Sequence, residues 1–169
     1  LDETVVKASL AIVVKTLNGL WARAARLEPE QRGLDKINFP PQLTEQASDP
    51  EVRDVVASET KLFDVRVFGR TGQKSQLRER VAQLNDEIAG LVAQEQAKDK
   101  EIALVEKELI GVRQLYDQRL IQLSRLTVLE RDLARLSGER AQYIASRAQA
   151  KGKVTETELQ IIQVDKEVV

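Results

Sequence analysis

The chain has 169 residues with 26 basic and 27 acidic side chains, which leaves a net charge of −1 and no polybasic surface for nucleic acid. It contains neither Cys nor His, so the commonest metal ligands and general bases are missing, and we expect no metal, no cofactor and no enzymatic activity. Only 4% of the residues are aromatic, and Ala, Leu, Glu, Gln, Lys, Arg and Val fill most positions, a composition typical of long helices.

The sequence also shows no membrane segment. No window approaches the roughly 18 to 20 apolar residues that cross a bilayer. The first residues, "LDETVVKASL", lack the basic-then-apolar order of a signal peptide. We therefore expect any membrane anchor of the native protein to lie outside these residues.

The first predicted helix covers residues 1–28 and is followed by a linker over residues 29–48. Pro29 and Gly33 oppose continuation of the helix, so we expect it to end near Leu27 or Glu28. The linker, with "NFPPQL" at its centre, is expected to run extended. The apolar or small residues of this helix have gaps that alternate four and three, a heptad seam: Val6, Leu10, Val13, Leu17, Leu20, Ala24 and Leu27.

A second, long helix is predicted over residues 49–121. In "SDPE", Asp49 or Ser48 can cap the helix and Pro50 suits its first turn. Gly69 and Gly72 would allow a local kink in this helix. Two polar residues, Glu95 and Lys98, interrupt its heptad seam, and we expect a weak spot there. The seam is Leu77, Val81, Leu84, Ile88, Leu91, Glu95, Lys98, Ile102, Val105, Leu109, Val112 and Tyr116.

A third helix is predicted over residues 127–169, with a tight turn at residues 122–126 before it. Thr127 and Glu130 have the T-x-x-E spacing of a capping box, which indicates that Thr127 begins the helix. Its apolar seam starts with Leu126, Leu129, Leu133 and Leu136.

Helix lengths constrain the predicted architecture. At about 1.5 Å per residue, the second helix is roughly 105 Å long and the third roughly 65 Å, so the third cannot cover the start of the second. The first helix has the right length to fill that gap. We therefore predict an all-α, elongated rod, in which a long antiparallel coiled-coil hairpin carries an additional N-terminal helix packed antiparallel on the early part of the long helix. The two ends of the chain should lie close together.

Four stretches together resemble one family: "LDETVVKASLAIV", "GQKSQLRERVAQLNDEIAGLVAQEQAKDKEIALVEKELIGV", "SRLTVLERDLARLSGE" and "AQAKGKVTETELQIIQVDKEV". They resemble the α-helical region of periplasmic membrane fusion (adaptor) proteins of type I secretion systems, the HlyD family, in its protease and lipase exporter branch. The resemblance covers essentially the whole chain. The family's transmembrane, lipoyl and β-barrel parts are absent from it.

In that family the hairpin tip carries an R-x6-L-x6-[ST] motif for docking to a TolC-like outer-membrane channel. Arg113, Leu120 and Thr127 match it in type and spacing. The resemblance further implies an inner-membrane ABC transporter as partner, a hexameric ring, an exported polypeptide as substrate, and a periplasmic region of an inner-membrane-anchored protein in a Gram-negative bacterium.

Simpler readings of the same residues stay open. Arg113 can be an ordinary solvated residue, Leu120 can close the seam below the turn, and Thr127 can be only a helix cap. The alternative function is a free-standing cytoplasmic coiled-coil scaffold or tether. A helix bundle on a membrane surface fits less well, because the polar faces mix both charge signs.

Overall fold

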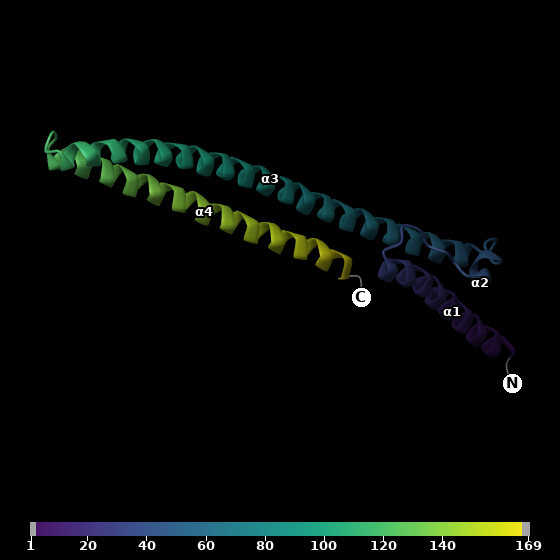
Figure 1. Cartoon of the computed structure of the whole chain (residues 1–169). Coiled ribbons are helices and arrows are strands. Elements are labelled where there is room, and N and C mark those ends of the chain that lie inside the picture. The colour runs from purple at the N-terminus through teal and green to yellow at the C-terminus, as the bar shows by residue number, and fades with distance from the viewer. Residues whose placement is uncertain (1–2, 167–169) are drawn as a thin grey trace. The chain divides into compact units, whose positions relative to one another are not determined.

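The computed structural model describes residues 3–166; Leu1, Asp2 and residues 167–169 lie outside the described part, and with them the expected proximity of the two chain ends. The described residues form four helices and no strand: α1 (Glu3–Arg32), α2 (Pro41–Thr44), α3 (Pro50–Asp117) and α4 (Leu123–Lys166) (Figure 1). This confirms the all-α class. The chain divides into two units, one formed by residues 1–77 and 160–169 and the other by residues 78–159.

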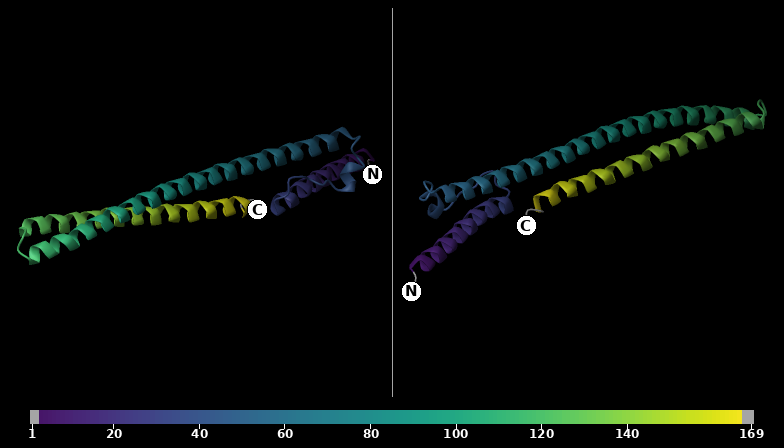
Figure 2. Two further views of the ribbon diagram at one scale, coloured as in Figure 1. Left: turned by 45° about the horizontal axis from the view of Figure 1, so that its top comes forward. Right: turned by 180° about the vertical axis from the view of Figure 1, so that it is seen from behind.

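The second unit is an antiparallel helical hairpin, in which α4 follows α3 back from the turn (Figure 2). Leu109, Leu126 and Leu129 form a buried cluster near the turn, and three half-buried apolar residues pack against it: Val105, Val112 and Leu133. Leu84 and Leu136 are buried further along the same seam. The predicted seam is therefore confirmed on both helices as far as Val112 of α3, whereas its last predicted residue, Tyr116, is exposed.

The polar residues Glu95 and Lys98 lie within the seam, and both form ion pairs with other side chains of the hairpin. The Lys98 ammonium lies 2.8 Å from Glu101 and 2.9 Å from Glu139, while Glu95 lies 2.7 Å from Arg147. The pKa of Glu139 is lowered, first by the hydrogen bond from Lys98 and then by that from Arg135. Such paired ions contribute little net stability, but they make other registers of the two helices costly, because a shift would leave charges facing apolar residues.

In the first unit, α1 packs on the early part of α3, as predicted. Ala22, Leu43 and Val52 form a buried cluster there, flanked by half-buried Trp21, Phe39, Val55 and Val56. Leu43 belongs to the short helix α2, so the linker is only partly extended. The sequence Pro40–Pro41 explains this helix, because the fixed φ of proline suits a first helical turn.

The face of α1 that contacts α3 differs from the prediction. Its buried residues are Asn18, Ala22, Arg26, Pro29 and Glu30, whereas the predicted seam residues Leu10, Leu17 and Leu20 expose 61%, 40% and 59% of their surface. A heptad pattern identifies an apolar stripe but does not say which helix covers it. Here small and polar residues are buried against α3, and the predicted seam residues are exposed.

The predicted end of the first helix near Leu27 or Glu28 is wrong, because α1 continues through Pro29 to Arg32. Gly33 ends it: this residue has φ +68°, and the Leu34 N–H donates to the Pro29 carbonyl at 2.9 Å while the Gly33 N–H donates to the Glu30 carbonyl at 3.1 Å. This is the Schellman pattern of helix termination. Pro29 costs the helix one hydrogen bond, but the last turn is held by the cap and by the ion pairs of Glu30.

Glu30 lies at the centre of a buried ion cluster that joins α1 to α3. The Arg26 guanidinium donates to both Glu30 carboxylate oxygens at 2.8 Å and also binds Glu59 on α3. Arg66 on α3 donates to Glu30 at 3.0 Å. Burial opposes the charged form of Arg26, but the hydrogen bonds and charges of Glu59 and Glu30 outweigh it, and the pKa of Arg26 is raised.

The ends of α3 and α4 in this unit are also held by polar contacts. Asp49 caps α3, since its carboxylate accepts a hydrogen bond from the Glu51 N–H at 2.9 Å, and this confirms the Asp49 alternative. Lys74 on α3 binds both carboxylate oxygens of Asp165 on α4 at 2.8 Å. Helix α3 is one continuous element through Gly69 and Gly72.

Helix α1 contradicts one expectation about membranes. Among the described residues, it is the one helix that is long and apolar enough to cross a bilayer by length and composition, with a mean hydropathy of 1.3 over its best window. Its Val, Ile and Leu content raises the mean although Lys7 and Lys15 interrupt the run. Its second half carries the buried Arg26–Glu30 pair, which binds it to α3.

Replacing Glu30 by Gln should destabilise the first unit by about 3 kcal/mol, because it leaves the buried Arg26 and the neighbouring Arg66 short of a counter-charge. Denaturant unfolding followed by circular dichroism measures the loss, and hydrogen exchange of α1 locates it. Glu28→Gln is the matched control, because Glu28 pairs with Arg32 in solvent and its loss should change little. Equal stability of the two variants would contradict the assigned role of the cluster.

Candidate functional site

The turn between α3 and α4 comprises residues 118–122, earlier than the predicted 122–126. Arg119 has φ +58°, its N–H donates to the Tyr116 carbonyl at 2.8 Å, and the Leu120 N–H donates to the Leu115 carbonyl at 2.9 Å. This is again the Schellman pattern, here with arginine where glycine is usual. Because the left-handed residue ends α3 at once, the chain reverses in few residues and α4 begins at Leu123.

The tip exposes large apolar side chains. Leu120 exposes 66% and Leu123 57% of its surface, and Leu115 and Tyr116 at the end of α3 are also exposed. The seam of the hairpin ends below them, at the cluster of Leu109, Leu126 and Leu129. Leu120 therefore does not close the seam, and the tip is an apolar surface that nothing within the described residues covers.

Arg113 lies on α3 below the tip and is paired within the hairpin. Its guanidinium donates to Glu130 on α4 at 2.9 Å. Arg125 on α4 makes a similar bond in the opposite sense, to Glu108 on α3 at 2.6 Å. These two ion pairs join the arms just below the turn, and their side chains are about half exposed. A partner of Arg113 would have to share or replace Glu130.

Thr127 does not cap α4, and that prediction is wrong. The helix begins at Leu123, and the Thr127 hydroxyl donates to the Leu123 carbonyl at 3.0 Å, inside the first turns. The T-x-x-E pattern misleads here because a threonine hydroxyl bonds equally well to the carbonyl four residues before it. Thr127 is half-buried, so part of its surface faces solvent.

The structure thus places Arg113, Leu120 and Thr127 near one turn but does not join them to each other. Their polar contacts go elsewhere, Arg113 to Glu130 and Thr127 to Leu123. Sequence reasoning missed Arg119 and Leu123. Arg119 lies exposed at the turn, with no ion-pair partner among residues 3–166. No sequence signal marks it, since left-handed backbone at a non-glycine residue is uncommon.

Replacing Arg119 by Gly should stabilise the hairpin by roughly 1 kcal/mol, because glycine adopts positive φ without the steric cost that a Cβ imposes. Thermal unfolding followed by circular dichroism measures the gain. Gln118→Gly is the control, since Gln118 is not among the residues with positive φ and should lose stability on the same change. A loss for Arg119→Gly would show that the arginine side chain itself holds the turn.

The geometry defines a long antiparallel helical hairpin with ion-paired arms and an exposed apolar tip. No group of His, Cys, Asp and Glu within the described residues could hold a metal ion. The model of the family described as "AprE, long alpha-helical hairpin" matches residues 6–169, and the chain belongs to this family.

Two known proteins are similar to the chain. It is 40% identical over 167 residues to the type I secretion system membrane fusion protein PrsE of Rhizobium meliloti (strain 1021), and the match covers 99% of the chain but 38% of that protein. In fold, it matches the crystal structure of the soluble domain of LipC, a membrane fusion protein of a type I secretion system. That match has a TM-score of 0.91 at 18% identity and covers 99% of this chain and 81% of the other.

Proposed function

We propose that the chain is the helical hairpin of a periplasmic adaptor that links an inner-membrane ABC transporter to a TolC-like outer-membrane channel. The observation that carries the proposal is the tip, where Leu120 and Leu123 stay exposed at the end of an otherwise zipped hairpin. The family and the similarity to PrsE favour this adaptor over a cytoplasmic scaffold. In this proposal the adaptor is anchored in the inner membrane of a Gram-negative bacterium and forms a hexameric ring.

The tip can bind helical hairpins of a channel by two kinds of contact. Leu120 and Leu123 bury in an apolar groove between partner helices. Arg119 supplies a charge-assisted hydrogen bond to a carboxylate or to carbonyls at a helix end. Each such contact is worth about 1 to 2 kcal/mol, and a ring of adaptors repeats it, so that weak contacts add to a firm junction. The exported polypeptide passes through the conduit that the ring encloses.

Leu120→Asp should abolish recovery of the channel protein with the adaptor and stop export of the substrate, because a carboxylate cannot enter an apolar groove. Affinity purification after cross-linking in cells measures the first effect and the secreted substrate the second. Leu104→Asp is the matched control: Leu104 is an equally exposed leucine, at 69%, on α3 away from the tip. Normal export by Leu120→Asp would refute docking through the tip.

Exchanging the Arg113–Glu130 pair separates docking from structure. The double variant Arg113→Glu with Glu130→Arg keeps an ion pair between the arms but moves the cation to α4. If Arg113 binds the channel, export should stay low in the double variant although its unfolding temperature recovers relative to Arg113→Glu. Full export by the double variant would leave Arg113 only a structural role. The same exchange of Glu108 and Arg125 serves as the control pair.

A further inference from the structure

The buried apolar side chains of the second unit's hairpin lie in two groups. The group near the turn is Leu109, Leu126, Leu129 and Leu136, and the other group is Leu84 with Ala150. Between the two groups lie residues 91–102 of α3 and 137–149 of α4, which we call the ionic section. All residues of the ionic section belong to the described part of the chain, and none of them is buried.

The ionic section offers less apolar contact than the segments on either side of it. The stabilisation that an apolar side chain provides scales with the area that it removes from water. Each large apolar residue of the section therefore stabilises the helix pair less than a buried leucine does. These residues are all half-buried: Leu91, Val92, Ile102, Tyr143 and Ile144.

Ion pairs connect the two arms across the ionic section. They are Lys98–Glu139 at 2.9 Å, Glu95–Arg147 at 2.7 Å, and Asp99–Arg140. The side chains of Asp99 and Arg140 are 49% and 40% exposed. Water and dissolved salt reach such groups and weaken the attraction between them. The arms are therefore held together less firmly in the ionic section than at the buried groups.

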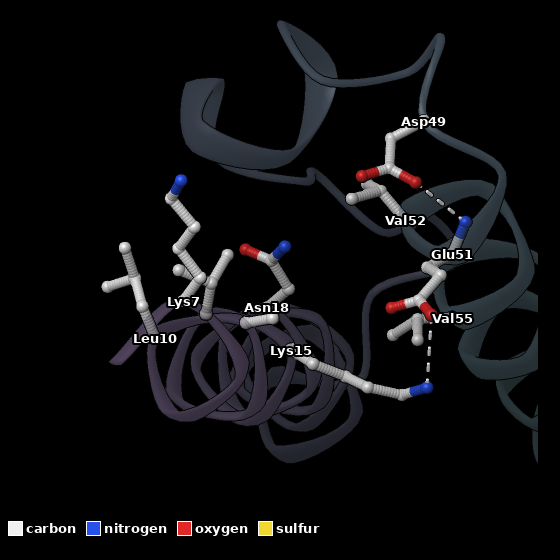
Figure 3. A pocket seen from close by; sticks show the side chains of 10 residues that line it. Lys7, Leu10, Lys15, Asn18, Asp49, Glu51, Val52 and Val55 are labelled. Carbon is white, nitrogen blue, oxygen red and sulfur yellow. Dashed lines mark hydrogen bonds and ion pairs between the residues drawn. The ribbon is translucent and has the colours of Figure 1, made fainter. Parts of the chain in front are cut away.

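The first unit shows how little an exposed ion pair does to close two helices on each other. Lys15 of α1 lies 3.3 Å from Glu51 of α3. Both residues nevertheless line an open groove of about 320 Å³ between the helices (Figure 3). Close packing of two helices requires apolar burial in addition to a pair of this kind.

Two ions of the section also have a partner on their own helix. The Lys98 ammonium lies 2.8 Å from Glu101 of α3, and Glu139 lies 2.7 Å from Arg135 of α4. If the arms separate here, both ions keep a counter-charge, because these partners move with them. Separation therefore costs less than it would for charges that are paired only across the arms.

Glu95 favours separation directly. Its Oε2 atom is buried and lies 2.7 Å from Arg147, yet no donor is aligned on it for a hydrogen bond. A buried carboxylate oxygen without an aligned donor destabilises the closed arrangement. Water would hydrate this oxygen once the arms separate.

Two glycines at the edge of the section weaken its helices. Gly90 precedes the section on α3, and Gly138 lies at its start on α4. A Cβ atom at either position would meet nothing within 4 Å, and neither residue has a positive φ. Neither packing nor backbone conformation therefore requires glycine there. Glycine inside a helix is less favourable than alanine, so both positions lower local helix stability.

We propose that the ionic section is a hinge of the hairpin, at which the two arms separate locally while the buried groups on both sides keep them together. The register of the arms is preserved, because the buried groups stay packed. The turn end of the hairpin can then change direction relative to the other end without unfolding. This inference goes beyond the proposed function and does not depend on it, because it concerns the hairpin alone.

Hydrogen exchange of the full-length protein tests the hinge. It is measured at low salt and at about 1 M salt, where the Debye length is about 3 Å. Backbone amides of the ionic section should exchange at least about tenfold faster than those around Leu109 and Leu129. High salt should accelerate them further, because it screens the ion pairs and leaves the apolar groups packed. Uniform exchange along the hairpin, or exchange in the section that does not respond to salt, would overturn the inference.

The double variant Lys98→Leu with Glu139→Leu should close the hinge, because it replaces an ion pair in the seam by apolar contact. Exchange in the ionic section should slow about tenfold and lose most of its dependence on salt. Glu108→Leu with Arg125→Leu is the matched control, since this pair also joins the arms but lies near the turn. Equal slowing of the ionic section by both double variants would contradict a hinge at this place.

Spin labels measure the separation of the arms itself, since the 169 residues contain no cysteine of their own. Lys100→Cys with Ala141→Cys places two exposed labels in the ionic section, and Lys107→Cys with Arg131→Cys places two exposed labels near the buried group at the turn. In a background without other cysteines, the first pair should give the broader distribution of distances, and high salt should widen it. Equal widths for the two pairs would refute the hinge.

Discussion

The apolar seam between α3 and α4 is the interaction on which the tip depends. Leu109, Leu126 and Leu129 are buried where the arms leave the turn. The two helices are therefore packed against each other almost to the turn. Leu120 and Leu123 beyond the seam are left without an internal partner. An apolar surface at the end of a stiff element is available to another protein because it cannot fold back to cover itself.

The ion pairs along the same hairpin decide how the arms align. Lys98 and Glu139 meet within the seam, and Arg113–Glu130 and Glu108–Arg125 meet below the turn. Apolar heptads alone tolerate a shift of one full repeat, since each layer resembles the next. Paired charges do not tolerate it, so they determine which residues of the chain come to lie at the tip.

In the first unit, polar side chains are buried between the helices and apolar side chains are exposed, the opposite of the hairpin. Helix α1 buries Asn18, Arg26 and Glu30 against α3 and exposes its leucines and valines. Burying the two charged groups is tolerable because Glu30 is bound by Arg26 and Arg66, and Arg26 also by Glu59. The arrangement explains why the most apolar of the long helices also exposes its large apolar side chains.

The sequence by itself determined the three long helices, the α3–α4 seam with its polar layer, and a cap at Ser48 or Asp49, because heptad period and capping residues act over a few neighbouring positions. It did not reveal that α1 continues through Pro29, that Thr127 lies inside α4, or that Arg119 takes a left-handed conformation. The first depends on ion pairs of Glu30 with a residue far along the chain, Arg66. The other two are local hydrogen-bond choices that several sequences allow, so the residue types do not decide between them. Tertiary packing also decided which side of α1 contacts α3. An apolar stripe shows that a helix needs a partner. Only the packed structure shows that α3 contacts another side of α1, the one that carries Arg26 and Glu30.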